Sequence, residues 1–344
     1  MNAPKPARPP RRQLDGVILL DKPLGLSSND ALQKVRRLLR AEKAGHTGTL
    51  DPLATGLLPL CFGAATKFSQ VSLDADKRYT ATLQLGRTTT TGDAEGEVLQ
   101  TRPVTADQVN AETIRAACDA YLGDIDQVPP MHSALKHQGR ALYEYAREGI
   151  EIERPARRVT LHAIDILDWQ HDVLTLDVRC SKGTYIRTLA QDIGERLGCG
   201  AHLIGLRRTG SGGISLQCAV TLDALQAMSE AERDAHLQPA DVLLADWPQV
   251  LLTEEDAARF LTGLRRRTRL PDAPQVRVYG PLPAQSAGLG RVLLGSAHIQ
   301  GGELIPTRLL SPAEVQGLLL MQQAPSAEAR PPAQAVAPQP DTVL

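Results

Sequence analysis

The sequence GHTGTLDPLATG, residues 45–56, holds the residue on which the interpretation of this chain depends. Asp51 lies between a leucine and Pro52, in a segment that contains three glycines and has no sustained periodicity. The following proline favours an extended backbone at Asp51, and a carboxylate among apolar side chains costs free energy unless a partner compensates it. An isolated Asp-Pro usually caps a turn. The glycines and apolar neighbours here favour an ordered loop with Asp51 in a functional pocket.

A second stretch, SKGTYIR at residues 181–187, supplies a candidate partner. It opens a helix expected to end near Leu197, where Gly198 follows. Arg187 falls in the first turn, where a cation opposes the helix dipole by ~0.3–1 kcal/mol. Lys182, Arg187 and the free backbone N–H groups predict an anion site, occupied by an RNA phosphate or by a buried carboxylate. The alternative is a solvated surface arginine.

Hydrophobic spacing predicts an α+β fold with a mainly antiparallel sheet, because strands and helices mix without regular alternation. The helix that follows Ser27 or Ser28 has one apolar and one basic face. Segment 88–96 is expected to be a polar loop. Strands are expected at 16–20, 79–85, 159–167, 173–180 and within 202–220, and helical spacing covers 106–122.

Two side chains near these elements are open to a structural or a functional interpretation. Tyr79 lies on the apolar face of its strand, where a tyrosine usually belongs to the core, although it could also stack on a nucleobase. His46 follows Gly45 and is expected to be exposed enough to enter a nucleic-acid fold.

Composition excludes several classes of function. The chain has 344 residues, 42% hydrophobic and 22% charged, with a net charge of −1, which is typical of a soluble globular protein. Charged residues interrupt every hydrophobic run, so no membrane span is expected. The basic N-terminus, 1–13, lacks the apolar core of a signal peptide, which predicts a flexible segment and a cytoplasmic protein.

No cofactor or metal is expected. The five cysteines are scattered without a C-x-x-C pair, and neither a phosphate-binding loop nor a G-x-G-x-x-G motif is present. Aromatic residues make up only 3%, which disfavours a module that binds single strands by stacking. Basic clusters such as Arg265 to Arg269 give weak support for phosphate contacts.

Composition also suggests where domains end. Pro239 to Trp247 is the expected boundary, followed by a small β-rich domain over 246–312 with a helix at 254–261 and a strand at 291–299. Residues 322–344 contain mainly Pro, Ala and Gln and are expected to form a disordered tail.

Five collinear segments between Gly16 and Thr209 closely resemble one known family. They begin GVILLDKP, AGHTGTLDP, DKRYTATLQLG, PPMHSALKHQG and CSKGTYIRTLA. Together they resemble the TruB family of tRNA pseudouridine-55 synthases. The resemblance implies a pseudouridine-synthase catalytic domain over 14–245, with a mixed, largely antiparallel sheet, and a PUA-like RNA-binding domain after it.

The resemblance also implies roles for individual residues. Asp51 matches the catalytic aspartate, Arg187 the arginine that pairs with it, and Tyr79 the aromatic residue that stacks on the base and helps remove the C5 proton. The remaining matches concern substrate binding: pocket-lining positions, the histidine that enters the T-loop, and a lysine of a nearby motif. These are Tyr185, Leu206, His46 and Lys22.

The implied activity is the isomerisation of uridine 55 in the tRNA T-loop, without cofactor, by a monomer that needs no protein partner. Asp51 could attack C1′, add to C6 or deprotonate C2′, and the sequence leaves all three open. A non-catalytic tRNA-binding or tRNA-folding protein on the same scaffold is one alternative. The catalytic subunit of a guide-RNA ribonucleoprotein is another, disfavoured because the tail lacks lysine runs.

Overall fold

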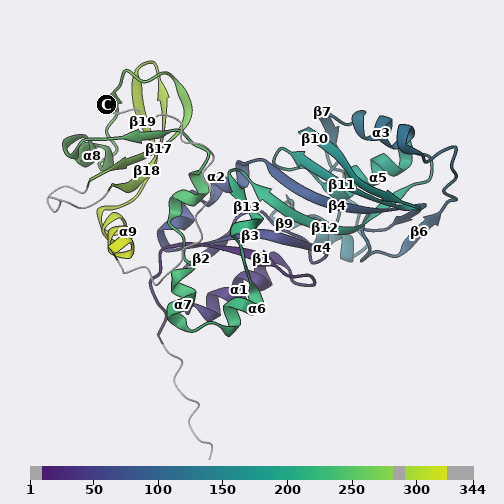
Figure 1. Cartoon of the computed structure of the whole chain (residues 1–344), viewed down its shortest axis with the longest axis horizontal. Coiled ribbons are helices and arrows are strands. Elements are labelled where there is room, and N and C mark those ends of the chain that lie inside the picture. Colours follow the sequence, from purple (N-terminus) through teal and green to yellow (C-terminus); the bar gives the residue numbers. More distant parts are fainter. Residues whose placement is uncertain (1–9, 282–290, 324–344) are drawn as a thin grey trace, which may run out of the picture.

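The computed structural model describes residues 10–281 and 291–323, which form a larger and a smaller β-rich part (Figure 1). The larger part contains a ten-stranded sheet. Its strands are β1 (Gly16–Lys22), β2 (Ala44–His46), β3 (Ala54–Phe62), β4 (Lys77–Leu85), β7 (Gly123–Gln127), β10 (Arg157–Gln170), β11 (Val173–Cys180), β12 (Ala201–Ser211), β13 (Ile214–Ser215) and β14 (Val220–Thr221).

The strand order is β14-β1-β3-β12-β4-β11-β10-β7, with β2 beside β3 and β13 beside β12. The β1–β14 and β3–β12 pairs are parallel, whereas the other pairs of this sheet are antiparallel. The expected mixed, largely antiparallel sheet is therefore confirmed. Two small hairpins lie outside it, β5 (Arg87–Thr89) with β6 (Val98–Thr101) and β8 (Lys136–His137) with β9 (Arg140–Ala141).

Helices cover both faces of this sheet. They are α1 (Ser28–Leu38), η1 (Gly63–Phe68), α2 (Ser69–Asp74), α3 (Ala111–Asp119), α4 (Leu142–Arg147), α5 (Ile186–Arg196), η2 (Leu216–Cys218), α6 (Leu222–Ala227), α7 (Glu230–Ala235) and η3 (Ala240–Leu244). Ser27 caps α1 by accepting a hydrogen bond from the Asp30 N–H, as its sequence predicts. Helix α5 ends before Gly198, which adopts a φ of 83°.

Strand β1 explains why its sequence is a continuous apolar run. Val17 and Leu19 belong to the core under the smaller part of the molecule, whereas Ile18 and Leu20 belong to the core under α1 and α6. Side chains alternate across a strand, so a strand buried on both faces needs apolar residues at every position.

Two cores share one face of the large sheet. One lies under α1 and α6, and the other lies between α3, α5 and strands β4, β10, β11 and β12. Tyr79 and Leu206 pack against both cores. The gap between the two cores therefore lies at the middle of the sheet, where β12 meets β4.

The smaller part is a five-stranded sheet, β15-β17-β18-β19-β16, with two helices. Its elements are β15 (Gln249–Leu251), α8 (Glu254–Leu261), β16 (Arg266–Arg267), β17 (Ala273–Gly280), β18 (Val292–Gln300), β19 (Glu303–Leu309) and α9 (Pro312–Gln323). The helix expected at 254–261 and a strand near 291–299 are confirmed.

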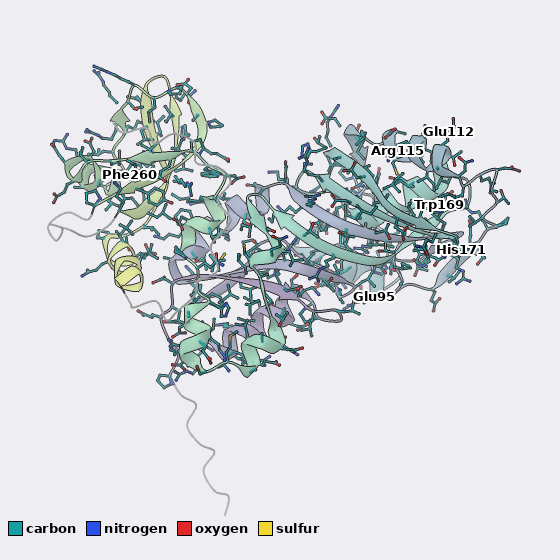
Figure 2. The ribbon with its side chains drawn as sticks, viewed as in Figure 1. Glu95, Glu112, Arg115, Trp169, His171 and Phe260 are labelled. Atoms are coloured by element: carbon teal, nitrogen blue, oxygen red, sulfur yellow. The ribbon has the colours of Figure 1, made fainter. Side chains whose placement is uncertain are left out.

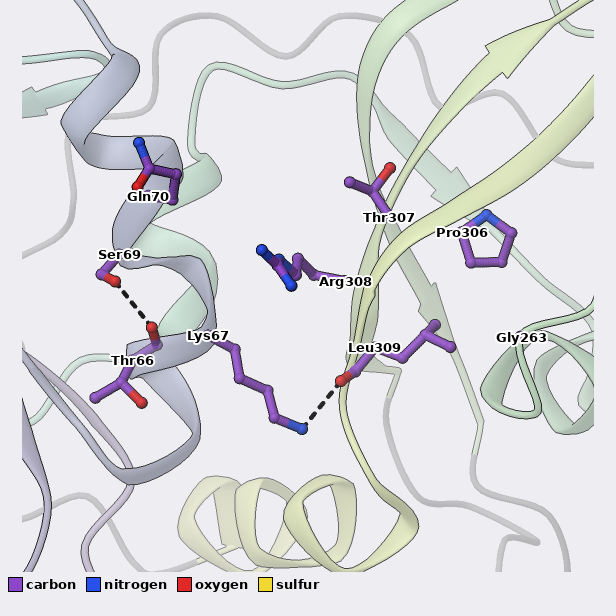
Figure 3. Close-up of a pocket in the computed structure, with 9 residues that line it drawn as sticks. All are labelled: Thr66, Lys67, Ser69, Gln70, Gly263, Pro306, Thr307, Arg308 and Leu309. Atoms are coloured by element: carbon purple, nitrogen blue, oxygen red, sulfur yellow. Dashed lines mark hydrogen bonds between the residues drawn. The ribbon is translucent and has the colours of Figure 1, made fainter.

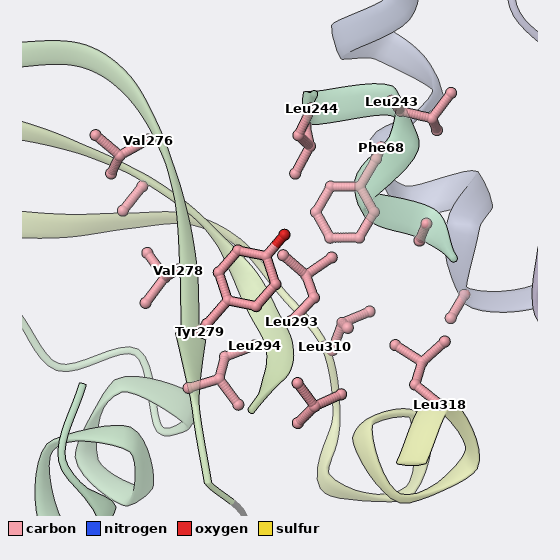
Figure 4. Close-up of a cluster of buried hydrophobic side chains, with 14 of the residues drawn as sticks. Phe68, Leu243, Leu244, Val276, Val278, Tyr279, Leu293, Leu294, Leu310 and Leu318 are labelled. Atoms are coloured by element: carbon pink, nitrogen blue, oxygen red, sulfur yellow. The ribbon is translucent and has the colours of Figure 1, made fainter. Parts of the chain in front are cut away.

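The two parts share one hydrophobic core. Figure 4 shows Phe68 and Leu244, from η1 and η3, facing Tyr279 and Leu293 of the smaller part. The Tyr279 hydroxyl also donates to Asp241 at 2.6 Å. Phe260 of α8 is fully buried in the same core, and Figure 2 places it inside the smaller part. This continuous apolar contact holds the smaller part against the larger one.

The structure corrects four expectations about local elements. Segment 45–56 is not entirely loop, because β2 and β3 occupy its two ends, and the helix expected over 106–122 is shorter. The polar loop at 88–96 begins inside β5. Helix α9 extends to Gln323, so the predicted tail begins inside a helix, and residues 324–344 lie outside the described residues.

The flexible segment expected over 1–13 does not include Arg12. The Arg12 N–H donates to the Arg40 carbonyl at 2.8 Å, and its guanidinium forms ion pairs with Asp234 and Glu230. These contacts fix the chain beside α1 and α7; residues 1–9 lie outside the described residues. In the described ranges, 10–281 and 291–323, no helix is both long and apolar enough to cross a membrane.

Gly56 allows a close backbone contact between β3 and β12. It adopts a φ of 98°, and a Cβ there would lie 2.3 Å from the Arg208 carbonyl oxygen and 2.8 Å from its nitrogen. We expect Gly56→Ala to destabilise the fold by about 3 kcal/mol or more, seen as a lower Tm in thermal unfolding. Gly139, with a φ of 85° and open space around it, is the matched control. Equal losses in Gly139→Ala would show that backbone strain alone, and not the close contact, is responsible.

Candidate active site

Asp51 occupies a short loop between β2 and β3 that is fixed on several sides. The Leu50 N–H donates to the Ser28 hydroxyl at 2.7 Å, which ties the loop to the start of α1. The Gly25 N–H donates to the Pro52 carbonyl at 2.8 Å, and the Ala54 N–H donates to the Asp51 carbonyl at 3.0 Å. The loop therefore holds the Asp51 carboxylate at the gap between the two cores.

Arg187 points from the first turn of α5 to this carboxylate. Its Nη2 lies 3.0 Å from Asp51 Oδ2, while the arginine side chain is only 7% exposed. The guanidinium also donates to the carbonyls of Thr91 and His132, at 3.1 and 2.6 Å. The cation at the helix start is thus paired with a carboxylate and is not the solvated surface arginine of the alternative interpretation.

Asp93 is a second carboxylate at Arg187 and was not singled out from the sequence. Its Oδ2 lies 3.6 Å from Arg187 Nη1, and its side chain is 3% exposed. The Thr91 hydroxyl and the Glu95 N–H donate to its Oδ1. Its only sequence signal is an acidic residue next to Gly92 in a polar loop, which also fits an ordinary turn.

The environment of Asp51 opposes its ionised form. Burial is the largest influence and raises the pKa of Asp51, and Asp93 adds to this effect, whereas Arg187 and Lys22 lower it. The carboxylate is still 40% exposed, so solvent or substrate can reach it. Arg187 therefore offsets only part of the desolvation cost.

Lys22 lies beneath the same loop with 0% exposure. Its ammonium group donates to the carbonyls of Pro23 and Leu26, at 3.0 and 2.6 Å. Burial lowers the pKa of Lys22 to about 8, and Asp51 is the largest influence in the opposite direction. Lys22 thus holds the turn at 23–26, which in turn bonds to the Asp51 loop.

Three further expected residues lie near Asp51. Tyr79 and Leu206 are partly buried on β4 and β12, and Leu206 pairs with Ala54 at the end of the Asp51 loop. Tyr185 directly precedes α5, and Gln127 holds it by accepting from its N–H at 2.7 Å and donating to its carbonyl at 3.1 Å. Burial raises the pKa of both tyrosines.

Two expectations about the site need correction. Lys182 does not join Arg187 in an anion site, because its ammonium pairs with Asp74 at 2.8 Å on the surface. His46, at the end of β2, is half-buried rather than freely exposed, and burial and the nearby Arg208 lower its pKa. Within the described part of the chain, its Nδ1 has no hydrogen-bond partner.

A groove in the described residues lies away from Asp51, between the larger and the smaller part. It has a volume of about 620 Å³ and runs between η1, α2 and β19, and Figure 3 shows Arg308 extending into it opposite Lys67. Glu95, labelled in Figure 2 at the lower edge of the larger part, belongs to the site instead: burial, Asp93 and Asp51 raise its pKa, and its N–H donates to Asp93 at 3.1 Å. Among the described residues, His, Cys, Asp and Glu form no group of three or more that could hold a metal ion.

The large sheet and its β-rich neighbour define a pseudouridine-synthase fold. The chain aligns with one from a Cbf5-Nop10-Gar1 complex at a TM-score of 0.64 and 24% identity, over 87% of this chain and 86% of that one. A chain of an archaeal box H/ACA sRNP Nop10-Cbf5 complex aligns at 0.61 and 23%, over 86% of both. At this identity the likeness concerns the fold alone.

Sequence comparison gives the family. The model "TruB family pseudouridylate synthase (N terminal domain)" matches residues 36–186, and "tRNA pseudouridylate synthase B C-terminal domain" matches 187–245. The chain is 59% identical to a tRNA pseudouridine synthase B of Cupriavidus pinatubonensis, covering 89% of this chain and 97% of the relative. A relative of the same name from Ralstonia pickettii is 58% identical, with coverages of 89% and 98%. The protein belongs to the TruB family and is an isomerase.

Proposed function

We propose that this enzyme converts uridine 55 in the T-loop of tRNA to pseudouridine. The observation that carries the proposal is the Asp51–Arg187 pair, which places a solvent-reachable carboxylate in a fixed loop between two cores. The substrate class is supported by close relatives that are named tRNA pseudouridine synthase B. The position within tRNA rests on the motif resemblance over 16–209.

The reaction is an isomerisation and balances without any cofactor. The N1–C1′ bond breaks, the uracil rotates, a C5–C1′ bond forms, the C5 proton leaves, and N1 gains a proton. The carboxylate of Asp51 attacks C1′, adds to C6, or removes the C2′ proton, and each route requires its ionised form. Arg187 supplies a fixed positive charge for that form.

The target base must leave its stack before Asp51 can reach it, at a cost of a few kcal/mol. We propose that Tyr79 stacks on the extruded base, that Tyr185 and Leu206 line its pocket, and that His46 fills the space it leaves. Lys22 holds the 23–26 turn beside the loop. The assignment is supported by Tyr79 and Leu206, which pack against both cores, and by the electrostatic influence of Asp51 on Tyr185 and Lys22.

Binding energy would come from phosphate and shape contacts to the T-arm. We propose that residues 246–312 form a PUA-like RNA-binding domain after a catalytic domain over 14–245, with exposed Arg267 and Arg269 as candidate phosphate contacts. We also propose a cytoplasmic monomer that needs no protein partner. The shared core between the two parts would keep this surface in a fixed position relative to Asp51.

The experiment that tests this function is tritium release from tRNA labelled at uridine C5, with the purified chain alone. We expect one tritium released per tRNA, because forming the C5–C1′ bond expels it. A tRNA with cytidine at position 55 should release no tritium above background. The unmodified tRNA and the position-55 variant form a matched pair. Binding without release would favour the tRNA-folding alternative. Release that requires an added guide RNA or protein would favour the ribonucleoprotein alternative.

A further inference from the structure

Arg208, on β12, is a fully buried arginine that the proposed mechanism does not yet use. It is 1% exposed and is among the largest fully buried side chains of the described residues. Its Nε donates to the Leu57 carbonyl at 2.6 Å and its Nη2 to the Gly48 carbonyl at 3.2 Å. Gly48 and Leu57 lie on either side of the Asp51 loop, so one guanidinium holds both ends of that segment.

A buried cation needs compensation, and this one has no carboxylate partner. No Asp or Glu of residues 10–281 and 291–323 forms an ion pair with Arg208, and Tyr79 is the acidic group that stabilises its charge. Burying an ammonium or guanidinium costs several kcal/mol unless a counter-charge or hydrogen bonds offset it. Two carbonyls supply part of that offset, and the Tyr79 phenol is the other group that favours the charge.

Tyr79 lies directly beside Arg208 in the sheet. The two residues are cross-strand partners in the antiparallel β4–β12 pair, so their side chains share one face. Burial raises the pKa of Tyr79, whereas the Arg208 charge and its hydrogen bond lower it. A Cβ on Gly48 would lie 3.1 Å from Arg208 Nη1, which shows how closely the loop packs on the guanidinium.

On the basis of the function proposed above, we propose that Arg208 is a positioning residue that fixes the Tyr79 phenol and the Asp51 loop together and stabilises the deprotonated phenol. The proton that the phenol loses goes to solvent. The phenolate then takes the C5 proton once C5 has joined C1′, which restores the phenol and the aromatic ring of the base. Without Arg208, this step would require a phenolate buried without a counter-charge.

Several titratable groups surround Tyr79 and influence its titration. From the loop and β11, Asp51 and Cys180 raise the pKa of Tyr79, while Arg208 on β12 lowers it. His46 on β2 and Lys77 on β4 lie near Arg208, which lowers the pKa of both. Arg208 is therefore the cation whose removal should change the Tyr79 phenol most.

The test replaces Tyr79 with 3,5-difluorotyrosine, whose more acidic phenol titrates in an accessible pH range and is followed by its phenolate absorbance. We expect Arg208→Met to raise the pKa of this phenol by about 1–3 units. Arg207→Met is the matched control, because Arg207 is the neighbouring arginine and pairs with Asp21; it should leave the phenol unchanged. A folded Arg208→Met protein with an unshifted phenol would overturn the proposal.

The second readout is single-turnover tritium release at saturating enzyme. Arg208→Met should slow release about 10²-fold or more while the Kd for tRNA changes less than about threefold, and its rate profile should move to higher pH.

Arg208→Lys keeps the positive charge but loses the two hydrogen bonds of the guanidinium to the Leu57 and Gly48 carbonyls. If Arg208→Met does not fold, Arg208→Lys is the variant that tests the proposal. We expect Arg208→Lys to leave the fluorotyrosine titration near wild type and to slow release. Wild-type release in Arg208→Lys would overturn the positioning role. If wild-type enzyme releases no tritium, the proposed function fails, and the titration still decides whether Arg208 stabilises the phenolate.

Discussion

Asp51→Asn should abolish tritium release from C5-labelled tRNA, by about 10⁴-fold or more, while tRNA binding is retained. An amide can neither form the covalent adduct nor accept a proton, so every route open to Asp51 is lost. Binding is expected to persist because the phosphate contacts proposed above lie in the smaller part, away from Asp51. Filter binding and single-turnover release on the same preparations make the comparison.

Acidic pH should reproduce this loss in the wild-type enzyme. Each of the proposed routes requires the ionised carboxylate, and burial raises the pKa of Asp51. Release should therefore decline, as pH falls, at a higher pH than a free aspartate with a pKa of about 3.9 would allow.

Asp74→Asn is the matched control, because Asp74 is a surface carboxylate paired with Lys182. It should release tritium at the wild-type rate. Residual release in Asp51→Asn within tenfold of wild type would remove Asp51 from the chemistry.

Arg187→Ala should slow tritium release by about 10²–10³-fold and leave the Kd for tRNA nearly unchanged. The guanidinium is buried against Asp51 and Asp93, so it acts on the carboxylate and not on the RNA surface. Its removal leaves two carboxylates without their cation. Because Arg187 lowers the pKa of Asp51, the acid limb of the rate profile should move to higher pH.

Stability should fall as well, because Asp93 is 3% exposed and loses its cation. Breaking a buried ion pair costs about 3–5 kcal/mol of folding free energy. The assays should therefore be run at a temperature well below the lowered Tm. Lys182→Ala is the matched control at the same helix start and should change neither rate nor acid limb. Equal losses of turnover and affinity in Arg187→Ala would contradict the pairing role.

The residues that the sequence could identify are those whose local pattern is unusual. Asp51 stands out because it is a carboxylate in an apolar, glycine-rich segment, and Arg187 because it is a cation where the helix dipole disfavours one. Strand 79–85 and the helix that begins after Ser27 were predictable because alternation and capping are local properties. The mixed sheet followed from the irregular order of such elements.

The residues that the sequence missed depend on contacts between distant segments. Asp93 becomes part of the site only because its loop meets α5, 94 positions further along the chain at Arg187. Arg208 looks like half of an ordinary Arg-Arg pair, yet β12 turns Arg207 toward Asp21 and buries Arg208 beside Tyr79. Lys182 and Arg187 share a helix start, and only packing separates the surface cation from the buried one.

The sequence by itself determined the class of fold, the family and the catalytic candidates, because periodicity, capping and rare motifs are recorded in short segments. The tertiary structure decided which charges meet. Electrostatic partnership depends on distances of a few ångströms between strands and loops remote in sequence, and on how far burial has removed water from between them. That is why Asp51 and Arg187 could be proposed as partners in advance, whereas Asp93 and Arg208 became evident only once β4, β12 and α5 had been placed around the same gap.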